Sequence, residues 1–305
     1  MEKKQKRSVL RQREDRQKLA LCLLPMLKIL LFSYLPMIGF VIAFERYRPR
    51  TMFLSEWVGF KNFDVIFKNK DIWQLFTNAV VLNSLYTLFG TLAGVIFALF
   101  LFELKNNIGI RIVQAAYLLP LFVSWPLIGL FVNSLLDVNG LLTNFLKLFG
   151  LHIEFYANAE YWRGIMTCVH IWRSAGITMM GYYAVLLNTD KQIYEAATLD
   201  GAGRFRCMWT ISMANLQPMI ILGFIQACGN IVRSDFSMNF FIIGGRTQLY
   251  EQVDVMESFM YRALMNASNF GNMIAMDLTQ ATIGLGMSLI VNYIIKKIAP
   301  DQALF

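Results

Sequence analysis

Long apolar runs alternate with shorter polar segments along the whole chain. A helix needs about 20 mostly apolar residues to cross a hydrocarbon core about 30 Å thick, and several runs are that long. No series of ten-residue alternating segments suggests a membrane barrel. The pattern predicts an all-α integral membrane protein with six transmembrane helices, over Leu19–Phe44, Asn78–Leu104, Ile112–Leu136, Gly164–Leu187, Leu216–Val232 and Met273–Ile298.

The composition agrees with a membrane protein, because 56% of the residues are hydrophobic and only 16% are charged. Soluble domains carry about 25% charged residues. The net charge is +8, and basic residues are concentrated in residues 1–18, which precede the first apolar run. We expect these residues to form a basic cytoplasmic tail against anionic lipid, which argues against a nucleic-acid partner. The run after the tail is too long for a signal-peptide core, so we expect it to remain as the first span.

The orientation follows from the Lys and Arg residues between the spans. More of them lie in the segments that are inside when the N-terminus is cytoplasmic, although the first outer loop goes against this trend. We therefore expect both termini in the cytoplasm, with residues 19–305 forming the transmembrane domain.

The loop of residues 188–213, between the fourth and fifth spans, has the pattern of a short helical pair. Thr189 is expected to cap a helix, with Gln192 closing a capping box. Gly201 and Gly203 are expected to form a turn with positive φ, and a second helix to start near Arg204. Because a polar, capped helix pair has no role inside a bilayer, we interpret the loop as a docking element.

The same loop resembles the coupling motif of ABC importer permeases, which is Glu-Ala-Ala, three residues, Gly, nine residues and Ile-x-Leu-Pro. Glu195-Ala196-Ala197, Gly201 and Ile211 have this spacing. Met213 and Ala214 stand where the family has leucine and proline. The flanking Ile171-Trp172-Arg173-x-x-Gly176 and Gln114-x-x-Tyr117-Leu-Leu-Pro120 are similar to the oligosaccharide-uptake branch, which includes the maltose-type permeases.

The resemblance implies a type I permease fold in a multi-pass protein of the bacterial plasma membrane. It also implies a heterodimer with a second homologous permease, two ATPase subunits, an extracytoplasmic sugar-binding protein and an oligosaccharide substrate. The residues expected to couple to the ATPase are Tyr194, Glu195, Ala196, Ala197, Asp200, Gly201 and Gly203. The sequence has no phosphate-binding loop, so ATP and Mg are expected in the partner ATPase and no cofactor in this chain.

Polar residues within the spans are candidates for the substrate pathway, because burying them in a membrane is costly. Arg173 is expected about 14 Å from the outer end of the fourth span. It could line the pathway or pair with a carboxylate of the partner permease, and the sequence favours neither. Gln226, Asn230, Arg233 and Asp235 follow near the outer end of the fifth span, with Asn230 and Arg233 expected on one helical face. Interhelical hydrogen bonding is a slightly better interpretation of this group than sugar binding.

Three other functions compete with oligosaccharide import. The same architecture could import another solute, such as an amino acid or a phosphonate. A membrane-embedded enzyme would need a paired nucleophile and base, or metal ligands such as His-Glu-x-x-His, and the sequence contains neither. We therefore expect no catalytic residue and no metal site. A scaffold that transports nothing is the third alternative.

Overall fold

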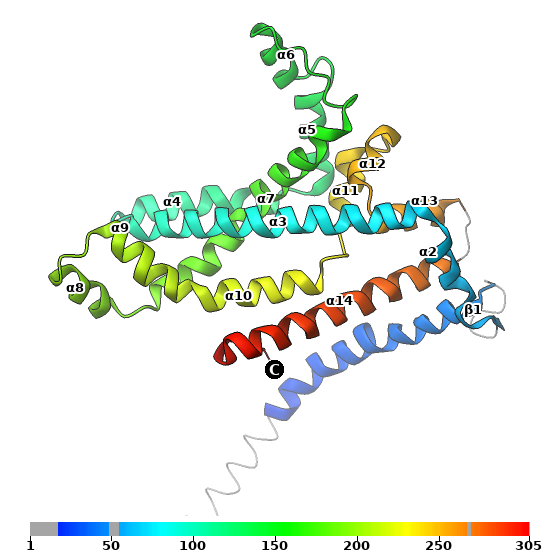
Figure 1. The fold of residues 1–305 in the computed structure, drawn as a ribbon, viewed down its shortest axis with the longest axis horizontal. Coiled ribbons are helices and arrows are strands. Elements are labelled where there is room, and N and C mark those ends of the chain that lie inside the picture. The colour runs from blue at the N-terminus through cyan, green and yellow to red at the C-terminus, as the bar shows by residue number, and fades with distance from the viewer. Residues whose placement is uncertain (1–17, 49–54, 267–269, 305) are drawn as a thin grey trace, which may run out of the picture. The chain divides into compact units, whose positions relative to one another are not determined.

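The computed structural model describes residues 18–48, 55–266 and 270–304, which are mostly helical (Figure 1). The chain divides into two compact units. The first comprises Met1–Val65 and Ser268–Leu278, and the second comprises Ile66–Ala267 and Thr279–Phe305. The last long helix, α14 (Phe270–Ile298), begins in the first unit and continues in the second.

The other helices, in chain order, are α2 (Asp64–Lys68), α3 (Lys70–Glu103), α4 (Asn107–Leu118), α5 (Trp125–Leu136), α6 (Leu141–Leu148), α7 (Trp162–Leu187), α8 (Lys191–Leu199), α9 (Arg204–Cys207), α10 (Met213–Gly229), α11 (Phe236–Ile243), α12 (Tyr250–Val253) and α13 (Met256–Met265). The shorter 3₁₀ and π segments are η1 (Leu30–Tyr34), η2 (Leu35–Phe44), η4 (Gly59–Phe63), η5 (Leu119–Phe122), η6 (Ala159–Tyr161), η7 (Met208–Ser212), η8 (Thr247–Leu249) and η9 (Pro300–Gln302).

Five helical segments of the described chain are long and apolar enough to cross a membrane. They are Lys18–Phe44, Lys70–Glu103, Trp125–Leu148, Arg204–Gly229 and Phe270–Ile298. The predicted first, second, fifth and sixth spans each fall on one of these segments. Helix α7 coincides with the predicted fourth span, but it is less apolar and is not among the five. The count of six spans therefore stays a prediction.

The predicted third span, Ile112–Leu136, is not one helix, and that prediction is wrong. The chain forms α4 and the short η5, becomes extended at Val123 and Ser124, and starts again as α5. Pro120 and Pro126 lie on either side of this break. Proline lacks a backbone N–H and has a fixed φ, so it starts a helix easily but is poorly tolerated within one.

The small β-hairpin of the first unit follows the first helical segment. Strands β1 (Glu45–Arg46) and β2 (Glu56–Trp57) pair in antiparallel orientation. The buried Asn62 side chain donates hydrogen bonds to the carbonyl oxygens of Ala43 (2.8 Å) and Glu45 (2.9 Å). These bonds hold η4 against the end of η2.

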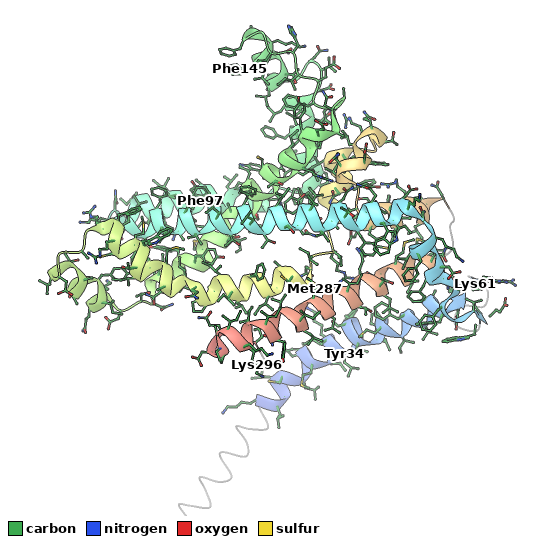
Figure 2. The ribbon with its side chains drawn as sticks, viewed as in Figure 1. Tyr34, Lys61, Phe97, Phe145, Met287 and Lys296 are labelled. Carbon is green, nitrogen blue, oxygen red and sulfur yellow. The ribbon has the colours of Figure 1, made fainter. Side chains whose placement is uncertain are left out.

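Helices α3 and α7 pack along one another in the second unit. One hydrophobic cluster includes Leu82 and Met166, and a second includes Leu99 and Met179. Each cluster therefore joins α3 to α7, one nearer the start of α3 and one nearer its end. Figure 2 labels Phe97 on α3, whose ring centroid lies 4.5 Å from that of Tyr117 on α4.

Helices α10 and α14 approach closely at two glycines. A Cβ atom added at Gly284 would overlap the carbonyl oxygen of Gly229, and one added at Gly229 would overlap the Ser288 hydroxyl. Small residues at such crossings allow backbones in membrane proteins to come into direct contact.

Candidate functional site

Helix α8 begins at a different cap from the one predicted. Asp190 is the N-cap, and its carboxylate accepts a hydrogen bond from the backbone N–H of Gln192 (2.9 Å). The Thr189 hydroxyl instead donates to the carbonyl oxygen of Val185 at the end of α7 (3.3 Å). The predicted Thr189 cap is therefore wrong, because Asp190 has the extended backbone that an N-cap requires.

The turn after α8 is a Schellman motif. Gly201 has φ +82°, its N–H donates to Thr198, and the N–H of Ala202 donates to Ala197 (2.9 Å). The predicted positive φ is confirmed for Gly201 but wrong for Gly203, which has φ −71°. Gly203 is extended because it is the N-cap of α9, which begins at Arg204 as predicted.

The residues predicted to couple to an ATPase fall into two groups. Glu195, Ala196, Asp200, Gly201 and Gly203 are exposed, whereas Tyr194 and Ala197 are half-buried. The exposed face of α8 also carries Leu199, of which 89% is accessible. This face of α8 therefore presents a carboxylate, small residues and one apolar side chain to the surroundings.

A cavity of about 460 Å³ lies among α3, α7 and α10. Two of the predicted pathway residues, Gln226 and Asn230, line it, whereas Arg173, Arg233 and Asp235 do not. The full lining is Tyr86, Thr87, Gly90, Thr91, His170, Ser174, Ile177, Thr178, Gly181, Tyr182, Met219, Leu222, Gly223, Gln226, Ala227 and Asn230.

The sequence analysis missed the contribution of α7 to this cavity. His170, Ser174 and Thr178 recur every four residues, which places them on one face of the helix and could have revealed them. The ring of His170 stacks on that of Tyr86 from α3, with centroids 4.2 Å apart and planes within 6°. The lining described here offers hydroxyl, amide and ring groups but no Asp, Glu, Lys or Arg side chain.

Arg173 contacts the break between η5 and α5. Its Nε and Nη2 atoms donate to the carbonyl oxygens of Val123 and Leu121, each at 3.4 Å. Its guanidinium lies 4.3 Å from the centre of the Trp125 ring. Carbonyl groups freed by a helix break need donors inside a membrane, and Arg173 provides them. The two roles predicted for Arg173, in the pathway or against a partner carboxylate, stay predictions.

The Asp235 side chain connects the N-terminal ends of α5 and α11. One carboxylate oxygen accepts the indole N–H of Trp125 (2.7 Å), and the other accepts the backbone N–H of Met238 (3.1 Å). The carboxylate thereby caps α11 and ties it to the first residue of α5.

Asn230 and Arg233 do not share a helical face, so that prediction is wrong. Helix α10 ends at Gly229, and the N–H of Arg233 donates to the carbonyl oxygen of Asn230 in a turn (3.0 Å). Asn83 of α3 holds this turn through its side-chain NH₂, which reaches the carbonyl oxygens of Ile231 (2.9 Å) and Arg233 (2.6 Å).

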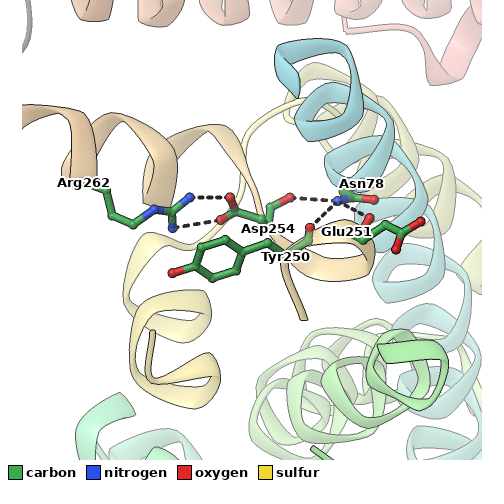
Figure 3. A network of polar contacts seen from close by, with 5 residues as sticks. All are labelled: Asn78, Tyr250, Glu251, Asp254 and Arg262. Carbon is green, nitrogen blue, oxygen red and sulfur yellow. Dashed lines mark hydrogen bonds and ion pairs between the residues drawn. The ribbon is translucent and has the colours of Figure 1, made fainter. Parts of the chain in front are cut away.

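A polar network holds α12 and α13 at the first turns of α3 (Figure 3). The fully buried Asn78 donates to the carbonyl oxygens of Tyr250 (3.3 Å), Glu251 (3.2 Å) and Asp254 (3.1 Å). Asp254 in turn forms a two-pronged ion pair with Arg262. Burial raises the pKa of the Asp254 carboxyl above its ordinary value, while the Arg262 guanidinium opposes this rise.

Two proteins of Bacillus subtilis (strain 168) are similar in sequence to this chain over most of its length. The polygalacturonan/rhamnogalacturonan transport system permease protein YteP is 33% identical over 304 residues, covering 98% of this chain and 94% of that protein. Protein LplB is 32% identical over 283 residues, covering 92% of this chain and 88% of that protein.

A solved structure is also similar to this chain. A bacterial ABC transporter involved in the import of the acidic polysaccharide alginate has a chain that is 26% identical, with a TM-score of 0.83 over 94% of this chain and 97% of that chain. Residues 90–300 match the family described as the binding-protein-dependent transport system inner membrane component. The chain therefore belongs to this family, the membrane permease subunits of ABC importers.

Proposed function

We propose that this chain forms half of the translocation pathway of an ATP-driven importer of oligosaccharides or complex glycans. The observation that carries the proposal is the 460 Å³ cavity among α3, α7 and α10. Sugar hydroxyls both donate and accept hydrogen bonds, and the cavity offers the amides of Gln226 and Asn230 and the hydroxyl groups of α3 and α7. The stacked rings of Tyr86 and His170 add an aromatic part to the lining, which is compatible with the apolar C–H groups of sugar rings.

The known relatives support a saccharide in preference to an amino acid or a phosphonate. Polygalacturonan, rhamnogalacturonan and alginate occur in the names of proteins that match this chain over more than nine-tenths of its length. The alginate importer has also been solved in complex with an alginate pentasaccharide-bound periplasmic protein. We infer that this chain likewise receives its substrate from an extracytoplasmic binding protein.

The other partners follow from the exposed face of α8. We propose that Glu195, Ala196, Leu199 and Asp200 contact a separate ATPase subunit, one of two that bind ATP and Mg. A second homologous permease would provide the other half of the pathway. This arrangement requires the α8–α9 loop and both termini to be cytoplasmic. The predicted basic tail lies outside the described residues except for Lys18, and its contact with lipid headgroups stays a prediction.

The proposal is tested by filling the cavity. A Cβ atom added at Gly223 meets no atom within 4 Å, so Gly223→Leu should fold while occupying space in the cavity. In the assembled transporter, we expect uptake of a labelled oligosaccharide to fall by about 10-fold or more, the effect of roughly 1.4 kcal/mol.

The matched control is Gly164→Leu on α7, where an added Cβ also meets no atom within 4 Å and which lies outside this cavity. Its uptake should be unchanged. Normal uptake by Gly223→Leu, at normal abundance, would exclude this cavity from the pathway. Competition by unlabelled amino acids or phosphonates, with none by oligosaccharides, would overturn the proposed substrate class.

A further inference from the structure

Tyr194 is the residue of α8 whose side chain bonds to another helix in the described structure. Its hydroxyl lies 2.9 Å from that of Ser212, and its ring centroid lies 5.7 Å from that of Phe102. Ser212 ends η7, and Phe102 belongs to the last turn of α3. One side chain therefore links α8 to α3 and to η7, the segment that leads into α10.

Ser212 lies where its helix departs from regular α-helical hydrogen bonding. It is 1% exposed and is the last residue of the π-helical η7, which leads directly into α10. Single π turns inside α-helices are frequent at functional sites. Pro218, inside α10, provides no backbone N–H and so removes one hydrogen bond, but α10 continues as one helix to Gly229. Beyond these two points, α10 reaches the cavity with Gln226.

The side of α8 that bears Tyr194 differs from the side proposed for docking. Tyr194 is half-buried, whereas its neighbours Glu195 and Ala196 are exposed. Leu199, at the end of the helix, is almost entirely accessible. The surface that an ATPase can reach and the side chain that reaches the cavity helices are thus provided by different residues of one short helix.

We propose that Tyr194 is a positioning residue that transmits the movement of α8 to α10 and α3, through its hydrogen bond to Ser212 and its contact with Phe102. The proposal rests on the proposed function and goes beyond it, because it separates the transmission of movement from the docking of the ATPase. When the ATPase displaces α8, the hydroxyl pair displaces the start of α10, and the cavity end of that helix follows.

The test uses the complete transporter in liposomes with three variants: Tyr194→Phe, Ser212→Ala and the double variant. The phenylalanine keeps the ring contact with Phe102 and removes only the hydroxyl. Three quantities are measured together: ATPase subunits recovered with the permease, ATP hydrolysed, and labelled oligosaccharide taken up. Tyr117→Phe is the matched control, because Tyr117 also packs on an aromatic ring of α3 but has no hydrogen bond from its hydroxyl in the described structure.

We expect each single variant to bind the ATPase normally while the sugar imported per ATP hydrolysed falls by about 2- to 10-fold, the range for loss of one hydrogen bond. The double variant should be no worse than either single variant, because both substitutions remove the same bond. Tyr117→Phe should match the unmodified protein in all three measurements.

Loss of ATPase recovery in Tyr194→Phe would make Tyr194 a docking residue and overturn the proposal. An unchanged ratio of sugar to ATP in both single variants, or fully additive losses in the double variant, would also overturn it. These outcomes leave the proposed function intact. Failure of the unmodified transporter to import any oligosaccharide would instead overturn the proposed function, and this proposal with it.

Discussion

Gly201 holds the turn between α8 and α9 in a left-handed backbone conformation. A residue with a Cβ atom adopts this conformation at a cost of about 1–2 kcal/mol, and a β-branched residue is especially strained there. We expect Gly201→Val to insert in the membrane at normal abundance, because the change lies outside the transmembrane helices. Recovery of the ATPase with the permease and oligosaccharide uptake should both fall several-fold, as measured by co-purification and by a transport assay.

Gly150→Val is the control for Gly201→Val. Gly150 also has a positive φ (+77°) and open space around it, but it follows α6, far along the chain from α8. The control should carry similar backbone strain and keep normal ATPase recovery. Normal uptake by Gly201→Val would remove α8 from the coupling mechanism.

Arg173→Met is expected to destabilise the protein through the break before α5. The substitution removes the donors to the carbonyl oxygens of Leu121 and Val123 and the contact with the Trp125 ring. An unsatisfied buried carbonyl costs about 1–3 kcal/mol, so the thermal unfolding temperature in detergent should fall. The exposed Arg111→Met is the control and should unfold as the unmodified protein does. Unchanged unfolding with impaired uptake would instead favour the pathway role of Arg173.

Single residues show where sequence reasoning reaches its limit. Thr189 and Asp190 are adjacent, and both can cap a helix, so the composition of the segment does not choose between them. The choice depends on where α7 ends, because the Thr189 hydroxyl is already bonded to its last turn. For Gly201, the glycine-specific conformation was predictable, because a helix that stops at a glycine usually does so with positive φ.

At the scale of elements, the contact between α10 and α14 leads to a further prediction. Gly284→Ala would place a methyl group against the carbonyl oxygen of Gly229, so the two helices would have to separate. Overpacking of this kind costs about 1–3 kcal/mol. Gly286→Ala lies two residues away on the same helix and meets no atom within 4 Å. The thermal unfolding temperature should be lowered by Gly284→Ala and not by Gly286→Ala. Equal stability of the two variants would contradict the close contact.

The helices themselves were largely predictable, because apolar length is read directly from the sequence. The break in the third span was not located, since Pro120 and Pro126 are compatible with a kink as well as with a complete interruption. The cavity was predictable only in part. Gln226 and Asn230 lie in one segment, but their proximity to His170 and Tyr86 depends on how α3, α7 and α10 are rotated against each other. That rotation is set by packing between distant segments.

At the scale of the whole molecule, the absence of a phosphate-binding loop from the sequence leads to a prediction about ATP hydrolysis. The purified chain alone should hydrolyse no ATP, because it lacks the backbone cradle and the lysine that hold nucleotide phosphates. Hydrolysis should begin when the ATPase subunits and the second permease are added, and it should rise with sugar-loaded binding protein. Nucleotide-specific hydrolysis by the chain alone would contradict this division of labour.

Helix α3 is engaged at both ends, by the α12–α13 network at Asn78 and by the ring of Tyr194 at Phe102. These positions are about 36 Å apart at 1.5 Å per residue, so one continuous helix spans the distance between them. In the proposed importer, a binding protein that docks at the α12–α13 end and an ATPase that moves α8 would both act on this helix. Thermodynamic linkage then makes their effects reciprocal: the factor by which nucleotide strengthens docking of the binding protein must equal the factor by which the binding protein strengthens nucleotide binding.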